Sequence, residues 1–395
     1  MNRRDFFKSG GLAALAGAAS LTQLSVHGAE GTAPAITSGP HLQELRPDRV
    51  TVVWTTDREC TGWVEYGADG RTDQRAVHSS HGLIDAMTRT HRVTLENLRP
   101  GTAYTYRIHA KEITRFLPYE VAYGGTASSE PVRFSTPAAA ESTLSFVVFN
   151  DVHAKKNVWE RLIPLAGKEP FDMAFLNGDN ISDPMSHEAV VRGALAPLDG
   201  LLAGVRPFVL VRGNHETRGA WARRLPEYVV LPEGRYYHSF TRGPVRFLVL
   251  DCGEDKTDQN KEYFGLVDFD RYIAEQMKWL EGEIAKPEFQ AAPFRVGFVH
   301  IPWPLEEPRG NSDPRDRFKP LLESANLDLL ICGHTHQHAV VEPAPGRSYP
   351  IFVGGGNEPG TATLIRVKAT EQDLSVVMLR DNGEPIAEKR IGRSA

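Results

Sequence analysis

The sequence has few of the residues that mark several protein classes. Only three cysteines occur among 395 residues, and Cys60, Cys252 and Cys332 lie far apart, with no Cys-x-x-Cys pair. Neither a disulfide framework nor a thiolate zinc site is indicated, and we expect three small buried hydrophobes. Basic charge is not in excess, with 45 Lys and Arg against 50 Asp and Glu, and no basic block follows the first ten residues. A surface for duplex nucleic acid is therefore not expected.

Long apolar runs, internal repeats and low-complexity tracts are also missing. Hydrophobic residues make up 41% and charged residues 24% of the chain, which is typical of soluble globular proteins. The length predicts two or three domains, at roughly 100 to 200 residues each. The sequence therefore predicts a multidomain protein with no transmembrane segment other than its N-terminal signal.

The first 28 residues are predicted to be an export signal. Arg3-Arg4-Asp5-Phe6-Phe7-Lys8 precedes a short apolar run from Gly10 to Leu21, and Val26-x-Gly28 offers small residues for cleavage. The adjacent arginines resemble a twin-arginine signal, which implies the twin-arginine export machinery as a partner and a periplasmic or other extracytoplasmic location. That route carries folded proteins, so metal can be loaded before export. An uncleaved anchor is an open alternative.

Residues 34–137 are predicted to form a β-sandwich. Short runs rich in β-branched and aromatic residues alternate with turn signals and show no helical period. The runs are Val50 to Thr55, Gly62 to Tyr66, Thr90 to Leu95, Tyr104 to Ala110 and Val132 to Ser135. The segment from Leu98 to Tyr104 resembles a fibronectin type III strand corner, in which the Tyr hydroxyl bonds to backbone. The alanine-rich Pro137 to Glu141 is expected to be a linker.

Residues 143–395 have a different pattern, which predicts an α/β domain. Apolar runs alternate with helical stretches, as expected of strands buried on both faces and joined by helices. The predicted strands are Leu144 to Phe149, Met173 to Leu176, Phe208 to Val211, Phe247 to Leu250, Val296 to Val299, Leu327 to Ile331, Ile351 to Val353, Ala362 to Val367 and Leu374 to Leu379. The predicted helices are Ser186 to Leu202, Phe269 to Ala285 and Arg315 to Ala325.

Five of these strands are followed at once by side chains that can bind metal. Because ligands bind beyond the carboxyl ends of strands in α/β sheets, we expect the five ends to meet in one crevice. The candidate donors are Asp151, His153, Asp179, Asn214, His300, His334 and His336. Gly178, Gly213 and Gly333 stand next to them, where a tight turn or a close backbone approach would exclude a Cβ.

Seven donors are too many for one tetrahedral zinc ion but suit two ions that share a carboxylate. Nitrogen and oxygen donors without sulfur favour manganese, iron or zinc. The sequence therefore predicts two divalent or trivalent metal ions of one of these elements.

The ordered series Asp151-x-His153, Gly178-Asp179, Gly213-Asn214-His215-Glu216, His300 and Gly333-His334-x-His336 resembles the calcineurin-like metallophosphoesterase family. The domain before it resembles the N-terminal domain of purple acid phosphatases. The resemblance implies a four-layer αββα sandwich in which Asp179 bridges the two metals. It assigns Asp151, His153, Asp179 and His336 to one metal and Asp179, Asn214, His300 and His334 to the other. His215 would face the leaving oxygen of the substrate.

The chain departs from the purple enzymes in three places. Those enzymes have Asp-x-Gly where this chain has Asp151-Val152-His153, and they have an iron-ligating tyrosine where this chain has Ser182. A colourless site of the non-purple type is therefore expected. Asp183 lies four residues after Asp179, whereas the family has its second aspartate three residues after the bridging one, so the resemblance gives Asp183 no role.

The predicted activity is hydrolysis of a small phosphate ester by a hydroxide that bridges the metals, with His215 as the acid that protonates the leaving group. Asn180 and Arg218 are the candidate contacts to phosphate. A phosphomonoesterase is preferred because of the N-terminal domain. Two alternatives stay open: a phosphodiesterase with the same site, and a catalytically silent, metal-containing binding protein of the cell envelope.

Overall fold

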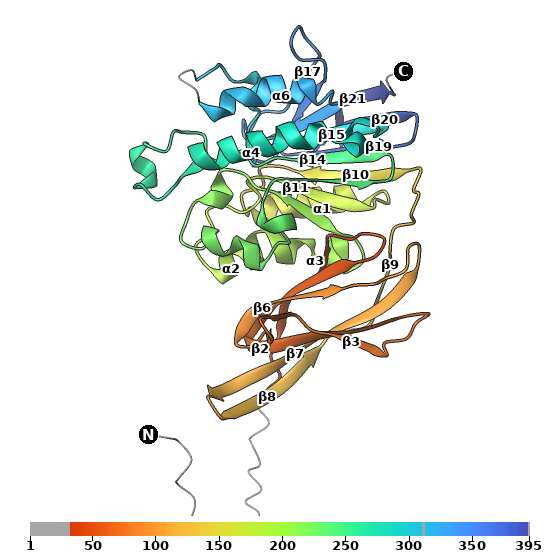
Figure 1. Cartoon of the computed structure of the whole chain (residues 1–395), viewed down its shortest axis with the longest axis vertical. Helices are drawn as coiled ribbons and strands as arrows, with labels where there is room; N and C mark the ends of the chain where they lie inside the picture. The colour runs from red at the N-terminus through yellow and green to blue at the C-terminus, as the bar shows by residue number, and fades with distance from the viewer. Residues whose placement is uncertain (1–31, 310–312, 394–395) are drawn as a thin grey trace, which may run out of the picture.

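The computed structural model describes residues 32–309 and 313–393 of the chain (Figure 1). The predicted export signal, residues 1–28, lies outside this range. Within the described residues, no helix combines the length and the apolar character that crossing a bilayer requires.

The N-terminal part is a β-sandwich, as predicted, which stands below the α/β part in Figure 1. Its strands are β1 (Ile36–Gln43), β2 (Val50–Ala68), β3 (Gln74–Ala76), β4 (Ser79–Ser80), β5 (Leu83–Ile84), β6 (Thr88–Leu95), β7 (Ala103–Leu117), β8 (Glu120–Ser128) and β9 (Val132–Ser135). The path β1-β2-β7-β8 carries the main hydrogen bonding, with β3 and β6 on β2 and β9 on β7. Trp54, Tyr106 and Phe134 lie in its core.

Two predicted strands of the sandwich are one strand in the structure. Val50 to Thr55 pairs with β6, the register then shifts, and from Cys60 the same strand pairs with β7. The predicted strand corner is confirmed, because the Tyr104 hydroxyl accepts a hydrogen bond from the Arg99 N–H at 2.9 Å. The predicted linker contains no helix or strand.

The C-terminal part contains two six-stranded sheets. The first has the order β12-β11-β10-β19-β20-β21 and the second β13-β14-β15-β16-β18-β17. The strands are β10 (Leu144–Phe149), β11 (Met173–Asn177), β12 (Phe208–Val211), β13 (His238–Arg242), β14 (Val245–Val249), β15 (Phe294–Phe298), β16 (Leu329–Cys332), β17 (Ala339–Val341), β18 (Ile351–Val353), β19 (Thr363–Ala369), β20 (Asp373–Arg380) and β21 (Pro385–Gly392). The helices are α1 (Lys156–Gly167), α2 (His187–Val190), α3 (Ala196–Leu202), α4 (Phe269–Ile284), α5 (Pro287–Gln290) and α6 (Phe318–Ser324).

The two sheets pack face to face, and helices cover both outer faces. Phe146 and Phe175 of the first sheet meet Phe247 and Phe298 of the second, with the Phe175 and Phe298 rings stacked at 4.1 Å. Helices α1 and α3 share a core with the outer face of the first sheet, and α4 and α6 do so with the second. The four-layer αββα class is confirmed.

The helix predicted over Ser186 to Leu202 is α2, a π-helical turn at Val191–Leu195, and α3. Helix α1 was not predicted, because Pro164 lies inside it and breaks the expected pattern. The two parts of the chain are joined by partly buried polar contacts: Asp199 of α3 accepts hydrogen bonds from the Ser38 hydroxyl and from the Gly39 N–H. The sandwich therefore packs on the helical layer of the first sheet.

Candidate metal centre

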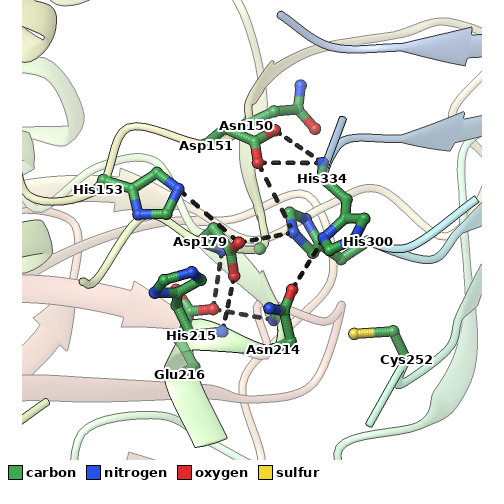
Figure 2. Close-up of polar contacts among 12 residues, drawn as sticks. Asn150, Asp151, His153, Asp179, Asn214, His215, Glu216, Cys252, His300 and His334 are labelled. Carbon is green, nitrogen blue, oxygen red and sulfur yellow. Dashed lines mark hydrogen bonds and ion pairs between the residues drawn. The ribbon is translucent and has the colours of Figure 1, made fainter. Parts of the chain in front are cut away.

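The candidate ligands lie where five strands end. Asp151 follows β10, Asp179 follows β11, Asn214 follows β12, His300 follows β15 and His334 follows β16. Strands β10, β11 and β12 are parallel neighbours in one sheet, and β14, β15 and β16 in the other. Their carboxyl ends therefore meet at one edge of the domain, where Figure 2 shows the side chains gathered around Asp179.

Short interatomic distances place the seven predicted ligands in one cluster. His300 Nε2 lies 3.0 Å and His153 Nε2 3.8 Å from Asp179 Oδ2. His336 Nε2 lies 3.7 Å from Asp151 Oδ1. His153 and His336 approach to 3.1 Å through their Nε2 atoms. On the far side of the cluster, His334 Nδ1 lies 3.1 Å from Asn214 Oδ1.

Two triads of donors can each surround an ion. The donor atoms of Asp151, His153 and His336 all lie within 4.8 Å of one another, and so do those of Asp179, His300 and His334. Asp179 also forms a group of the same size with His153 and His215. Among the described residues, Asp179 thus belongs both to a group around His153 and to one around His300, as a bridging ligand would.

The protonation pattern of His300 fits a metal ligand. Its Nδ1 lies 2.9 Å from the Asn177 carbonyl oxygen, so this nitrogen keeps its proton and Nε2 is the one that can give up its proton and bind a metal. That Nε2 is buried and lies between the carboxylates of Asp179 and Asp151, at 3.0 and 3.7 Å. A metal ion held by these carboxylates would therefore meet the lone pair of the neutral ring.

The backbone of the cluster is held in an unusual conformation. Five candidate ligands have positive φ: Asp151 (51°), His153 (51°), Asp179 (52°), His334 (74°) and His336 (56°). Such conformations of non-glycine residues cost of order 1–3 kcal/mol each and gather at functional sites. Hydrogen bonds offset this cost, since the Asp151 carboxylate accepts from the His334 N–H at 3.0 Å and the His153 N–H donates to the Asp179 carbonyl at 2.7 Å.

The three glycines are needed for close approach, as predicted. A Cβ on Gly178 would stand 2.2 Å from His300 Nδ1, one on Gly213 2.3 Å from Asp179 Oδ1, and one on Gly333 2.5 Å from Asp151 Oδ2. Gly178 alone of the three also has positive φ, at 80°. Each glycine lets one strand end pass against a candidate ligand from another strand.

Burial sets the charge state of the imidazoles. Loss of solvation lowers the pKa of His153 and of His334 to about 4, and it also lowers the pKa of His336. These rings are therefore neutral near pH 7, which is the form that binds metal. For His300, burial lowers the pKa, but the nearby Asp179 and Asp151 charges outweigh it and raise the pKa to about 10. A cation at this place would replace that proton.

His215 stands at the edge of the cluster, with its ring centroid 4.6 Å from that of His153. Its Nδ1 lies 3.1 Å from Asp183 Oδ1, and its Nε2 lies 3.1 Å from Arg218 Nη1. The carboxylate that pairs with this ring is therefore Asp183, whereas Asp179 Oδ1 accepts from the His215 backbone N–H at 2.9 Å.

The two candidate phosphate contacts have other partners in the structure. Asn180 is fully buried, and its Nδ2 donates to the Gly178 carbonyl at 2.9 Å. Arg218 is half-buried and forms ion pairs with Glu254 and Asp255, at 3.0 and 3.5 Å. Arg218 Nη1 still reaches the ring of His215, so of the two side chains it is the one turned toward the cluster.

Glu216 is a functional residue that the sequence reasoning left without a role. Its buried carboxylate accepts three backbone hydrogen bonds, from Asp179 at 2.8 Å, Gly213 at 2.9 Å and Ile181 at 3.0 Å. It therefore ties the loop after β12 to the loop after β11. The sequence did hold a clue to this role. A carboxylate that closely follows a buried strand and a glycine is expected to be buried, and a buried carboxylate needs hydrogen-bond donors.

We expect Glu216→Gln to loosen this tie. The amide that replaces the carboxylate turns an NH2 group toward one of the three N–H donors, so at least one buried hydrogen bond is lost. The expected cost is about 1–3 kcal/mol of unfolding free energy and roughly 10- to 100-fold in metal affinity. Chemical denaturation and metal titration measure both, with Glu227→Gln, an exposed partner of Arg224, as control. Unchanged metal affinity would contradict the positioning role.

Comparison with known proteins gives this geometry a family. Residues 144–338 match the family model of calcineurin-like phosphoesterases, and residues 39–136 match that of the purple acid phosphatase N-terminal domain. The chain has a calcineurin-like phosphoesterase domain. The N-terminal purple acid phosphatase domain and the phosphatase relatives also support a metal-dependent phosphoester hydrolase.

Curated relatives match this chain over most of its length. It is 23% identical over 377 residues to the probable purple acid phosphatase 20 of Arabidopsis thaliana, which covers 87% of this chain and 79% of the relative. It is 25% identical to the acid phosphatase type 7 of Mus musculus, over 81% of this chain and 74% of that one. The solved structure of purple acid phosphatase PPD1 from yellow lupin shares its fold, with a TM-score of 0.66 at 16% identity over 92% of this chain and 75% of the other. The solved structure of PhoD also shares its fold, with a TM-score of 0.62 at 14% identity over 92% of this chain and 94% of the other.

We expect the iron-loaded protein to be colourless. Ser182 stands where the purple enzymes have the tyrosine whose phenolate binds ferric iron, so that phenolate is missing. An absorption spectrum across the visible range should therefore lack a charge-transfer band, whereas a purple acid phosphatase measured alongside shows one. A visible band that disappears when the iron is removed would contradict this expectation.

Proposed function

We propose that this protein hydrolyses phosphate monoesters at a binuclear metal centre. The observation that carries the proposal is the position of Asp179, whose Oδ2 lies 3.8 Å from His153 Nε2 on one side and 3.0 Å from His300 Nε2 on the other. Asp151, His153, Asp179 and His336 would hold one ion, and Asp179, Asn214, His300 and His334 the other. Manganese, iron and zinc all suit this nitrogen and oxygen set.

When bound, two such cations supply Lewis acidity to the phosphoryl group and lower the pKa of a shared water toward neutrality. Residues of the chain position the ligands and transfer the proton. Buried carboxylates and glycine turns hold the ligands in place before substrate arrives, so little reorganisation accompanies the reaction. Asp183 accepts from His215 Nδ1, and Arg218 Nη1 donates to His215 Nε2, so Nε2 carries no proton in this arrangement. Nε2 would have to take up a proton once a substrate oxygen replaces it as the partner of Arg218, and that proton would then pass to the departing alkoxide.

Arg218 supports this arrangement from the other side. Glu254 fixes its Nε and Nη2 atoms, at 3.0 Å each, while Nη1 points to His215 Nε2. When a substrate oxygen takes the place beside His215, Nη1 is positioned to donate to it. Arg218 would thus orient phosphate, whereas Asn180 would act by holding the loop after β11.

The test is hydrolysis of p-nitrophenyl phosphate and of bis-p-nitrophenyl phosphate by chelator-treated protein after addition of manganese, zinc or iron. The proposal expects activity to return with metal and to be greater on the monoester. Greater activity on the diester would favour the phosphodiesterase alternative. No turnover of either ester, with metal bound, would favour the silent binding protein.

Export belongs to the same proposal and rests on residues 1–28 alone. Cleavage after the small residues near Gly28 would release a chain that begins close to β1. Mass spectrometry of the N-terminus of protein recovered from outside the cytoplasm tests this point.

A further inference from the structure

The exposed apolar side chains of the α/β domain lie at the edge that holds the metal centre. In the described residues of this domain, four large hydrophobic side chains are exposed: Met185, Phe264, Leu266 and Leu305. Met185 lies between β11 and α2, Phe264 and Leu266 lie between β14 and α4, and Leu305 follows β15. All four are therefore in loops that leave the carboxyl ends of the strands, as the candidate metal ligands do. Exposed apolar residues scattered over a surface need no explanation, but a set confined to one edge indicates a binding surface.

The loops that carry these side chains are tied to the segment that follows His215. The Pro184 carbonyl, in the loop after β11, accepts from the Trp221 N–H at 2.9 Å. Arg223 Nη2 donates to the Leu266 carbonyl, in the loop after β14, at 2.9 Å. The apolar loops therefore contact this segment on two sides.

Met185 stands beside the residues that hold the His215 ring. A Cβ on Gly219 would lie 2.9 Å from Met185 Sδ. Gly219 directly follows Arg218, whose Nη1 lies 3.1 Å from His215 Nε2. Asp183, two residues before Met185, bonds to His215 Nδ1 at 3.1 Å. The Met185 side chain is 61% exposed, so it offers apolar surface next to the ring that would protonate the leaving alcohol.

A cavity of about 410 Å³ lies between the loops after β12 and β14. Most of its lining residues are apolar or aromatic, and Leu266 and Phe269 are among them. Thr217, two residues after His215, also lines it. The charged lining residues each have a hydrogen-bonding partner: Arg212, Arg223 and Asp268. A hollow of this size and apolar character is typical of a site for a small organic group.

We propose that this edge binds the alcohol part of a phosphate monoester and selects esters of large apolar alcohols. The inference rests on the proposed function, because a phosphate held at the metals would direct its alcohol toward His215, the group that protonates it. Met185 and Leu266 are the residues that set the preference, one on each side of the segment after His215. The apolar surface of the alcohol leaves water when it covers them, and the gain in affinity grows with the area removed from water.

Phosphonates test this inference separately from the reaction. Full-length chain loaded with manganese is titrated by calorimetry with ethylphosphonate and with hexylphosphonate. These probes have a C–P bond in place of the ester oxygen, so they bind without being hydrolysed, and they differ only in apolar length. The same samples are assayed on ethyl phosphate and hexyl phosphate, whose leaving alkoxides are similarly basic. The test variant is Met185→Ser with Leu266→Ser, and the matched control is Met87→Ser with Leu83→Ser, at an exposed Met and Leu of the sandwich.

Hexylphosphonate is expected to bind about tenfold or more tightly than ethylphosphonate, and kcat/KM should favour hexyl phosphate by a similar factor. The test variant should lose most of both preferences, whereas the control should keep them. Equal affinity for the two phosphonates, or a preference that survives in the test variant, overturns the inference, and hydrolysis of both esters would then leave the proposed function standing. A phosphonate preference that the test variant loses, without hydrolysis of either ester, supports the apolar site and overturns the proposed function instead.

Discussion

Asp179→Asn is expected to abolish most of the phosphatase activity, with a loss in kcat/KM of at least about 10³-fold. The substitution removes the negative charge that His153 and His300 share, at 3.8 and 3.0 Å from Oδ2. It keeps the volume of the side chain and an oxygen that can still accept from the His215 N–H. The expected cause is therefore loss of bound metal rather than loss of fold.

The matched control is Asp172→Asn. Asp172 lies just before β11, at the opposite end of the strand that Asp179 follows, and its carboxylate accepts from the Ser145 N–H at 2.7 Å. This variant should keep its metal and its activity. The measurements are steady-state kinetics and bound metal by elemental analysis. Full activity in Asp179→Asn, with wild-type metal content, would contradict the bridging role.

His215→Ala is expected to lower turnover by an amount that depends on the leaving group. If the imidazole gives a proton to the departing oxygen, an alkyl phosphate with a basic leaving group should lose roughly 10²- to 10⁴-fold in rate. A p-nitrophenyl ester, whose leaving group needs little protonation, should lose much less. Metal content should stay at the wild-type level, because the His215 side chain is not one of the proposed ligands.

Asp183→Asn separates positioning from acid catalysis. The amide oxygen can still accept from His215 Nδ1, so the ring should stay oriented, while the negative charge beside it is removed. We expect the same dependence on leaving group as in His215→Ala, but smaller. Equal losses on alkyl and p-nitrophenyl esters in His215→Ala would refute the acid role and leave orientation of phosphate as its function.

The strand ends of the α/β part could be predicted because each strand is buried on both faces. Such strands appear in the sequence as continuous apolar runs. The polar residues that follow the runs therefore mark the strand ends, which meet at one edge of the sheets. The runs before Asp151, Asp179 and Asn214 match β10, β11 and β12 to within one residue. The close contacts at Gly178, Gly213 and Gly333 could also be predicted, since a glycine beside a candidate ligand indicates that a Cβ would not fit there.

Contacts that depend on loop conformation could not be predicted in this way. The pairing of Asp183 with His215 arises from loops after different strands, and Asp183 itself has positive φ, at 36°. The three bonds that Glu216 accepts also join separate loops. The prediction divided strand β2 into Val50 to Thr55 and Gly62 to Tyr66, whereas the residues between them, with Asp57 and Glu59 exposed, lie at a register shift within a single strand.

The most direct test of the account is the number of metal ions that one chain binds. Chelator-treated protein is reconstituted with manganese or zinc, freed of excess metal, and assayed for metal and protein in the same sample. The account predicts two ions per chain in the wild type and fewer in Asp179→Asn. A wild-type protein that saturates at one ion per chain while hydrolysing phosphate esters at full rate would contradict a centre built around a shared Asp179.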